Sequence, residues 1–531
     1  MLESGGMKTT LIPLPGRLEE RAGAFRLEPD AAIGFEGPDS AREMAELLAE
    51  YLRPATGFAL PVREGAGAIA IAQPAPDPAP DDAGFLPEGY ALDVAPGGVR
   101  LEAATSWGLA RGVQTLRQLF PAEVYAAEAR PGLAWEAPAV RIEDAPACRW
   151  RGLMLDATSH FWDADDVCRF VELLAQHRMN VFHWHLTDDQ GWRLEIRRHP
   201  RLTEIGSKRA ETMVGNHITD WPHRFDGTPY GGFYTQDDIR RVVAFAARRR
   251  VTVVPEIDMP GHVCAAIAAY PELGGGDWAH PAVRTTWGIS QHVLNMEEST
   301  IAFCEDVWDE AMELFPSKFL HIGGDEAPRH EWEESKRAQE LMAERGLTRP
   351  EQLQAWFTKR MDAFFRSRGR RLIGWDEILE GGVDPSAAIA CWRTAWKGWG
   401  YVEDAARAGH DVVLAPNSHA YFDYYQDEPV AEEPLAIGGM LPLSKVYSFD
   451  PRLADGPPEA ARRVLGGQGQ LWTEYIATRD RLDYMAYPRA SALAEVLWTP
   501  PGRRRYADFL ERLAAHRARF RVQGVNARPR P

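Results

Sequence analysis

Between residues 151 and 497, short and almost continuous apolar runs alternate with longer segments whose apolar residues recur every three or four positions. The first pattern is typical of strands buried on both faces, and the second of helices that cover such strands. Val167, Phe170, Val171 and Leu174 mark one of these helices, and Thr235 is a suitable N-cap for another. Eight strands are predicted, at 152–156, 180–186, 251–255, the start of 318–326, 371–375, 388–392, 411–414 and 467–472.

Eight strand–helix units predict an α/β fold, a (β/α)₈ TIM barrel, over residues 141–502. In that architecture the functional residues lie at the C-terminal ends of the strands. Residues 503–531 are predicted to form a C-terminal helix and tail, with Leu510, Leu513 and Phe520 on its apolar side. We expect this helix to pack on the barrel, and a partner subunit is the alternative.

Residues 1–140 predict a small α+β accessory domain in front of the barrel. Apolar spacing indicates helices at 42–52 and 107–119, and an apolar run indicates a strand at 68–71. Strands at 90–94 and 99–101 flank Pro96-Gly97-Gly98, which is typical of a hairpin. No catalytic group of residues is apparent here, so we expect a packing role.

Composition narrows the class of protein mainly by exclusion. Hydrophobic residues make up 45% of the 531 residues and charged residues 26%, which is ordinary for a globular protein. The formal charge of −17 argues against nucleic acid or an anionic membrane as partner. No run is long enough to cross a bilayer. We expect a monomer or homodimer.

The cysteines and the N-terminal residues give indications of the cellular compartment. Five cysteines at wide spacing, with no CxxC, argue against a disulfide framework or a zinc ribbon. Residues 1–8 lack the apolar core of a signal peptide, so the expected location is cytoplasmic, with a trimmed leader left open.

Candidate chemistry is concentrated where the predicted strands end. Asp325 and Glu326 follow the fourth strand after two glycines, and adjacent carboxyl groups at a buried strand end favour a raised pKa, as a general acid needs. A solvent-exposed acid pair is the ordinary alternative. However, acids or aromatic residues follow the other strands as well, at Asp156, Asp188, Asp258 with His262, Trp375, Trp392, Tyr421 with Asp423, and Trp472 with Glu474.

Three segments together resemble the signature segments of the β-N-acetylhexosaminidases of glycoside hydrolase family 20. They are NVFHWHLTDDQGW at 180–192, PEIDMPGH at 255–262 and HIGGDE at 321–326. Further matching segments, GWDE, CWR, YFD and LWTE, follow in family order, and the resemblance extends over about residues 10–500.

The resemblance implies exo-acting removal of a terminal, β-linked N-acetylglucosamine or N-acetylgalactosamine from an oligosaccharide or glycoconjugate, without a metal or other cofactor. It implies that the substrate's own acetamido oxygen attacks C1, giving an oxazolinium intermediate and net retention. By this match Glu326 is the general acid, Asp325 holds the acetamido group, and Asp188 with His262 supports Glu326. The implied substrate-binding residues are Trp375, Trp392, Tyr421, Asp423, Trp472 and Glu474.

Two positions depart from the family pattern. Ser159 stands where relatives carry an arginine that grips hydroxyls 3 and 4 of the terminal sugar, and loss of such charged hydrogen bonds costs about 1.5–3 kcal/mol. No tryptophan occurs between Asp423 and Gly438, where some relatives cap the pocket. Release of a disaccharide, or of a 3- or 4-substituted sugar, is therefore an alternative.

Two further alternatives lie outside the family. His183 and His185 fall on the same side of a strand, so they could hold a zinc ion in a metal-dependent barrel hydrolase. Alternatively they are hydrogen-bonded inside the barrel. A carbohydrate-binding pseudoenzyme is the last alternative, and the intact Asp325–Glu326 pair argues against it.

Overall fold

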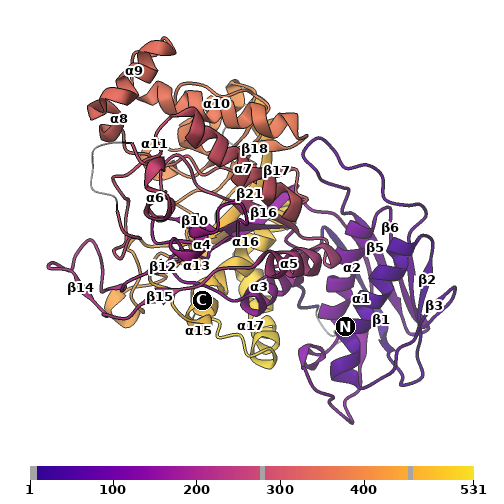
Figure 1. Ribbon diagram of the computed structural model, residues 1–531. Coiled ribbons are helices and arrows are strands. Elements are labelled where there is room, and N and C mark those ends of the chain that lie inside the picture. Colours follow the sequence, from indigo (N-terminus) through magenta and orange to yellow (C-terminus); the bar gives the residue numbers. More distant parts are fainter. Residues whose placement is uncertain (1–8, 276–280, 453–457, 531) are drawn as a thin grey trace.

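The computed structural model describes residues 9–275, 281–452 and 458–530, and its larger part is a closed barrel of eight parallel strands (Figure 1). Every strand pairs with the next one along the chain, and the last pairs with the first. The predicted TIM barrel is therefore confirmed. Its strands are β8 (Trp150–Asp156), β9 (Val181–His185), β16 (Thr252–Glu256), β17 (Phe319–His321), β18 (Arg371–Trp375), β19 (Ala388–Cys391), β20 (Val412–Leu414) and β21 (Val464–Leu471).

Helices connect most of these strands and cover the outside of the barrel. One connection differs, because only residues 376–387 separate β18 from β19 and they hold just the 3₁₀-helix η3 (Asp376–Leu379). Thr235 caps α5 in a capping box with Asp238, as its position predicted. The main covering helices are α3 (Ala164–Gln176), α5 (Gln236–Arg248), α7 (Glu298–Leu314), α10 (Glu351–Ser367), α12 (Gly400–Arg407) and α16 (Arg489–Trp498).

Shorter elements line the loops around the barrel. The longest inserted loop region, between β9 and α5, carries β10 (Thr187–Asp188), β11 (Gly191–Trp192), α4 (Arg201–Glu204), β12 (Lys208–Arg209), β13 (Met213–Val214), β14 (Arg224–Phe225) and β15 (Tyr230–Gly231). The others are α6 (Cys264–Ala269), η2 (Pro271–Leu273), α8 (His330–Glu334), α9 (Lys336–Glu344), α11 (Thr394–Lys397), η4 (Val430–Glu432), α13 (Leu443–Tyr447), α14 (Pro458–Arg463), α15 (Arg479–Ala486) and η5 (Pro501–Arg503).

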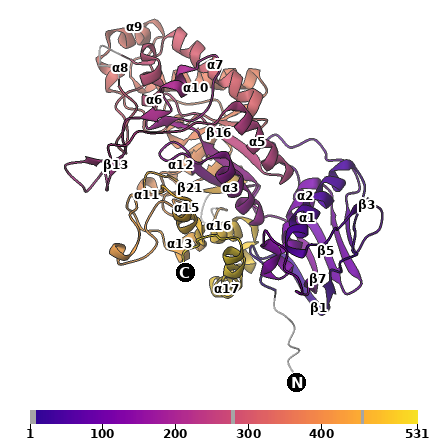
Figure 2. The ribbon, with the colours of Figure 1, turned by 60° about the horizontal axis from the view of Figure 1, so that its bottom comes forward.

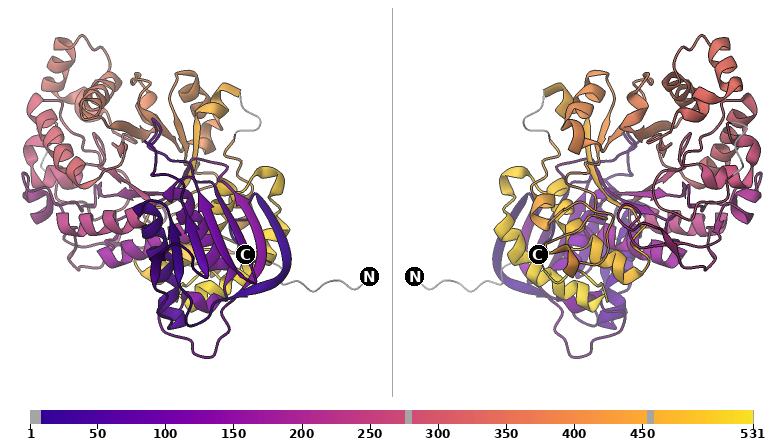
Figure 3. Two further views of the ribbon diagram at one scale, coloured as in Figure 1. Left: turned by 90° about the vertical axis from the view of Figure 1, so that its right-hand side faces the viewer. Right: turned by 90° about the vertical axis from the view of Figure 1, so that its left-hand side faces the viewer.

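The N-terminal domain is a seven-stranded sheet in the order β1-β7-β5-β6-β4-β2-β3, with helices between the sheet and the barrel (Figure 3). The predicted helices and hairpin are present, and the hairpin pairs Val94 with Val99. The elements are β1 (Arg17–Arg26), β2 (Ile33–Glu36), α1 (Asp39–Thr56), β3 (Val62–Glu64), β4 (Ile69–Ala72), β5 (Tyr90–Ala95), β6 (Gly98–Ala103), α2 (Ser106–Leu119), η1 (Ala122–Tyr125) and β7 (Glu136–Asp144).

A buried ionic group joins this domain to the barrel. The carboxylate of Glu88 accepts hydrogen bonds from Arg111 on α2 at 2.8 Å, from Arg151 on β8, and from Asn180 before β9 at 2.7 Å. All four side chains are buried. Removing one partner from such a group leaves a charge without compensation, which is strongly destabilising. This buried group therefore holds the N-terminal domain against the amino ends of the barrel strands.

The C-terminal helix α17 (Tyr506–Val522) packs on the barrel, as predicted, and also contacts the N-terminal domain (Figure 2). Phe509, Leu513 and Phe520 are buried in the barrel's hydrophobic cluster. Arg512 forms two hydrogen bonds, of 2.6 and 2.7 Å, with Glu495 of α16. Arg519 donates to the carbonyl of Gln118 in α2 at 2.8 Å. The helix therefore ties the two domains together.

The five cysteines are all free and buried, which agrees with the expectation that they build no disulfide framework. Across the described ranges, no helix combines the length and apolarity needed to cross a membrane.

Candidate active site

A cavity of about 610 Å³ opens at the carboxyl ends of the barrel strands. All ten residues selected from the sequence line it, and they lie at the ends of seven barrel strands or in the segments that follow those strands. Ser159 and Asp258 line the same cavity. The ten are Asp188, His262, Asp325, Glu326, Trp375, Trp392, Tyr421, Asp423, Trp472 and Glu474.

The loop after β17 fixes the Asp325–Glu326 pair. Gly323 has φ +68°, and a Cβ there would lie 1.9 Å from Oδ1 of Asp258, so only glycine fits. The Gly324 N–H donates to the same Oδ1 at 3.1 Å, and its carbonyl accepts from Gln354 at 2.7 Å. Glu326 itself has φ +47°, a strained value for a residue with a side chain. The backbone thus holds Asp325 inward and Glu326 at the rim.

The carboxyl groups of Asp258 and Asp325 are both buried, and each affects the pKa of the other. Burial, and next to it the Asp325 carboxylate, raise the pKa of Asp258 well above its usual range. Burial also raises the pKa of Asp325, while the cationic His262 and a hydrogen bond with Asp258 oppose this. Within the pair, Asp258 is therefore the group that more readily holds a proton, and Asp325 is the group that more readily carries the negative charge.

His262 lies between the two carboxyl groups of the pair. Its Nε2 is 3.8 Å from Asp325 Oδ2 and 3.7 Å from Glu326 Oε2, and its Nδ1 is 2.9 Å from Asp188 Oδ1. Burial lowers the pKa of His262, but the carboxylates of Asp188, Asp189 and Asp325 together outweigh burial and raise it well above the usual value. Burial and the charge of Asp325 raise the pKa of Glu326 to about 7. Glu326 thus carries a proton near neutrality beside a cationic imidazole.

A buried glutamate that the sequence analysis did not select forms the floor of the site. The carboxylate of Glu256, at the end of β16, lies 2.9 Å from His183 Nε2, 2.6 Å from His185 Nδ1 and 3.0 Å from His321 Nδ1. It also accepts a hydrogen bond of 2.8 Å from Trp375 Nε1. Side chains from three other strands, β9, β17 and β18, meet on this one acid, so it holds the pocket floor together.

His185 links this floor to the catalytic pair. Its Nε2 is 3.4 Å from Asp188 Oδ2, and Asp188 in turn binds His262. Burial raises the pKa of Asp188, but the charge of His262 and hydrogen bonds from His185 and His262 bring it below its usual range. A continuous polar chain therefore runs from Glu256 to Glu326.

Aromatic side chains form one wall of the cavity. Trp392 and Tyr421 stack with ring centroids 6.1 Å apart, and Trp375 lies 6.3 Å from Trp472. Trp392 Nε1 donates to Glu377 at 3.0 Å, which fixes its ring. Aromatic faces held in this way suit the apolar faces of a sugar ring and a methyl group.

Four buried polar atoms on the cavity wall lack a hydrogen-bond partner among the described residues. They are His262 Nε2, Asp325 Oδ1, Asp423 Oδ1 and Glu474 Oε2. Burial raises the pKa of Asp423 to about 7 and, with the charges of Asp156 and Asp423, raises that of Glu474 well above its usual range. Because buried polar groups without partners are costly, these atoms fit a polar ligand with several hydroxyl or amide groups.

Side chains at the floor of the cavity lie close enough together to be compared with a metal site. His183 and His185 do lie on the same side of β9, since both contact Glu256 Oε2. Ligand atoms of His183, Glu256 and His321 lie within 4.8 Å of one another. However, each imidazole already pairs with the Glu256 carboxylate, as expected for histidines hydrogen-bonded inside a barrel. The group is also buried beneath the cavity and has no position open to a substrate.

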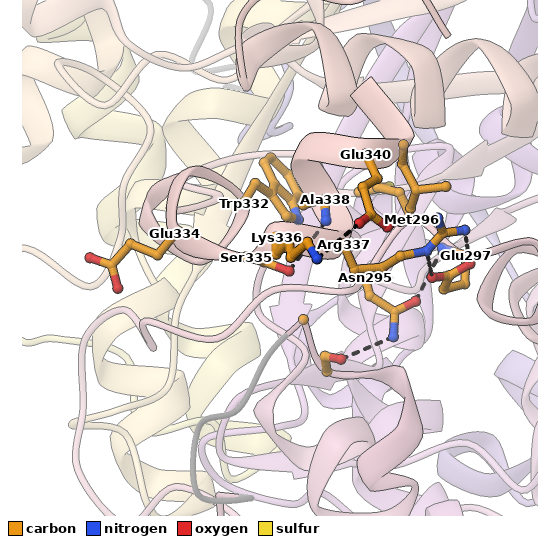
Figure 4. Close-up of a pocket in the computed structure, with 13 residues that line it drawn as sticks. Asn295, Met296, Glu297, Trp332, Glu334, Ser335, Lys336, Arg337, Ala338 and Glu340 are labelled. Carbon is orange, nitrogen blue, oxygen red and sulfur yellow. Dashed lines mark hydrogen bonds and ion pairs between the residues drawn. The ribbon is translucent and has the colours of Figure 1, made fainter. Parts of the chain in front are cut away.

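A second cavity, of about 710 Å³, lies beside α8 and α9, away from the strand ends (Figure 4). Most of its charged side chains pair with each other: Arg337 contacts Glu297 at 2.6 Å and Glu340 at 3.4 Å. Asn295 donates to the carbonyl of Gly274 at 2.9 Å. With these groups already paired, this cavity offers less to a polar ligand than the barrel mouth does.

Two long loops complete the barrel-mouth cavity and were not predicted. One spans residues 212–223 and the other residues 284–291, and neither carries a periodic pattern or a motif. Asp189, next to Asp188, anchors the second loop by accepting from Ser290 N–H at 2.8 Å. The lining residues they add are His217, His223, Arg284, Trp287, Gly288, Ile289 and Gln291.

Family models match nearly the whole chain. Residues 148–501 match the model described as glycosyl hydrolase family 20, catalytic domain, and residues 8–145 match glycosyl hydrolase family 20, domain 2. The two matched ranges coincide with the barrel and the N-terminal sheet domain.

Individual relatives agree with the family models. A Porphyromonas gingivalis protein named beta-hexosaminidase is 40% identical over 522 residues, which are 97% of this chain but 64% of that protein. The GH20 beta-N-acetylhexosaminidase structure from Streptomyces coelicolor has a TM-score of 0.84 at 34% identity and covers 98% of both chains. A mutant Streptomyces plicatus beta-hexosaminidase in complex with its product GlcNAc also has a TM-score of 0.84 at 34% identity, over 98% of this chain and 97% of that one.

Proposed function

Because this chain belongs to glycosyl hydrolase family 20, we propose that it removes a terminal β-linked N-acetylhexosamine from the non-reducing end of an oligosaccharide or glycoconjugate. The observation that carries this proposal is the single cavity in which a protonated Glu326, a charged Asp325 and unpartnered hydroxyl-binding carboxyl groups meet. The chain spans about two-thirds of its Porphyromonas gingivalis relative, which is named for the same activity.

In the first step, Glu326 gives its proton to the leaving oxygen while the acetamido oxygen of the substrate attacks C1. The carboxylate of Asp325 accepts a hydrogen bond from the acetamido N–H and so orients that oxygen. The oxazolinium ion formed is cationic, and the charge of Asp325 stabilises it where it develops. Trp375, Trp392 and Tyr421 would enclose the acetamido methyl group and support its carbonyl.

In the second step, the deprotonated Glu326 takes a proton from a water molecule. This water attacks C1 and opens the oxazolinium ring, which restores the acetamido group. Two displacements at C1 give a product with the β configuration retained. His262, held by Asp188, stabilises the Glu326 carboxylate between the two steps. Asp423 and Glu474 would bind the remaining sugar hydroxyls through their free oxygens.

The test is hydrolysis of 4-methylumbelliferyl N-acetyl-β-glucosaminide and the corresponding galactosaminide, with the first-formed anomer followed by ¹H NMR. We expect turnover of at least one substrate and initial release of the β anomer. Absence of activity on both substrates, or initial release of the α anomer, would overturn the proposal.

A further inference from the structure

The two loops that complete the barrel-mouth cavity contribute a group of basic side chains to its lining. His217 donates its backbone N–H to the Tyr475 hydroxyl at 3.0 Å, and its Nδ1 lies 2.8 Å from the same oxygen. His223 Nε2 lies 3.1 Å from the His217 carbonyl. Since Tyr475 follows Glu474 directly, both histidines lie beside the Glu474 side of the cavity.

Arg284 is the third member of this group. Its guanidinium contacts only the backbone carbonyls of Thr286 at 3.2 Å and Trp287 at 3.3 Å. No carboxylate of the described residues lies within ion-pair distance of it. The arginines on the opposite side of the catalytic pair differ, because Arg329 and Arg393 each pair with glutamates or aspartates.

The three groups lie close together. The charges of His223 and Arg284 add to burial in lowering the pKa of His217. A Cβ built on Gly288, in the Arg284 loop, would be 3.4 Å from the His217 ring. We call His217, His223 and Arg284 the basic wall.

The basic wall lies beyond Ser159. The Trp287 ring, in the same loop as Arg284, is 5.7 Å from the ring of His160. Arg209 donates to the Ser159 carbonyl at 2.7 Å, and its guanidinium lies 5.2 Å from the Trp287 centroid. The serine side chain is short, so no long side chain from this position stands between the sugar site and the wall.

The orientation of the sugar decides which atoms face the wall. With C1 at Glu326 and C2 at Asp325, C4 lies across the pyranose ring from C1, with C3 next to it. The family match places Ser159 where relatives bind hydroxyls 3 and 4, so these hydroxyls would face Ser159, and a substituent on them would extend past it toward the basic wall.

We propose that the basic wall binds an oxyanion ester, a sulfate or phosphate, on O4 or O3 of the terminal N-acetylhexosamine. This inference rests on the proposed function and specifies its substrate. An arginine without an acidic partner beside two imidazoles supplies charged hydrogen bonds that suit sulfate or phosphate oxygens. A neutral sugar in the same space would offer Arg284 only uncharged acceptors, which form weaker hydrogen bonds than an oxyanion does.

The test compares kcat/KM for 4-methylumbelliferyl N-acetyl-β-glucosaminide with that for its 4-O-sulfate, 3-O-sulfate, 6-O-sulfate and 4-O-phosphate. The native protein should prefer a 4- or 3-ester over the 6-sulfate. In Arg284→Gln the ratio of kcat/KM for the preferred ester to that for the unsubstituted substrate should fall about tenfold or more, the effect of losing hydrogen bonds to a charged group. Sulfate and phosphate esters in parallel identify which oxyanion is used.

Arg349→Gln is the matched control, because Arg349 is exposed and does not line the cavity. It should leave the ratio unchanged. His217→Gln provides a second test of the same ratio should Arg284→Gln not fold, and thermal denaturation establishes folding for each variant.

Three results would overturn the inference. The first is an equal loss on substituted and unsubstituted substrates in Arg284→Gln, which would mean that Arg284 binds the sugar hydroxyls themselves. The second is no turnover of any ester, and the third is a higher kcat/KM for the 6-sulfate than for every 4- or 3-ester. Absence of activity on all substrates, the unsubstituted one included, would instead refute the proposed function.

Discussion

The cationic ring of His262 lies 3.7 Å from the carboxyl group of Glu326, and this distance sets a testable pH dependence. Glu326 must be protonated to act as the acid, and its pKa is raised to about 7. The value of kcat/KM should therefore fall as the pH rises through about 7. The charge of His262 favours the ionised form of Glu326, so replacing His262 by glutamine should raise that pKa further and move the alkaline limb to higher pH.

The size of the shift follows from Coulomb's law. Two unit charges about 4 Å apart interact by about 1 kcal/mol in water and about 4 kcal/mol at an effective dielectric constant of about 20. The Glu326 side chain is 35% exposed at the cavity rim, so solvent screens the pair in part and the interaction lies between these two figures, nearer the lower one. Since about 1.4 kcal/mol corresponds to one pKa unit, the alkaline limb should move up by about one pH unit. The Asp188 carboxylate, no longer paired with His262, acts in the same direction.

The assay is the pH profile of kcat/KM for N,N′-diacetylchitobiose, whose alkoxide leaving group needs the proton. Asp325→Asn is the matched variant, because it removes a negative neighbour of Glu326 and should move the limb to lower pH. The opposite signs distinguish a charge effect from a general loss of structure. An alkaline limb that stays in place or moves down in His262→Gln would refute the reasoning.

Three further predictions follow from the same structure. Glu326→Gln should lower kcat/KM for chitobiose by about 10²–10⁴-fold but much less for a nitrophenyl glycoside, whose leaving group needs no proton, and equal losses would contradict its role as acid. Asp325→Asn should raise the inhibition constant of a thiazoline analogue of the oxazolinium ion. An unchanged inhibition constant would contradict the contact between Asp325 and the acetamido group. Arg512→Met leaves the buried Glu495 without its cationic partner, so it should lower the free energy of unfolding by about 3–5 kcal/mol in chemical denaturation. An unchanged free energy of unfolding would contradict a stabilising role for this ion pair.

The barrel could be predicted because its strands are buried on both faces, and burial on both faces gives continuous apolar runs. The N-terminal sheet was harder. Strand β1 is mostly exposed at the sheet edge and its register shifts between Glu20 and Ala24, so its sequence carries no clean alternation. Strand β7 includes Pro138, which weakens a strand pattern.

The site residues could be predicted where an acid or an aromatic residue follows a strand, because the barrel brings all strand ends together. Glu256 was missed since nothing near it in sequence shows that His183, His185 and His321 converge on its carboxylate. Arg284 was missed for a similar reason, because its loop has no repeating pattern and its place is set by contacts with Asp189.

The role of the substrate's acetamido group is the central claim, and fluorination of that group tests it most directly. The measurement is kcat/KM for glycosides bearing N-acetyl, N-fluoroacetyl, N-difluoroacetyl and N-trifluoroacetyl groups. Each fluorine withdraws electrons from the carbonyl oxygen and weakens it as a nucleophile. If that oxygen attacks C1 with Asp325 holding the N–H, the rate should fall steeply with each fluorine. A rate that is independent of fluorination would show that another group attacks C1 and would contradict the proposed mechanism.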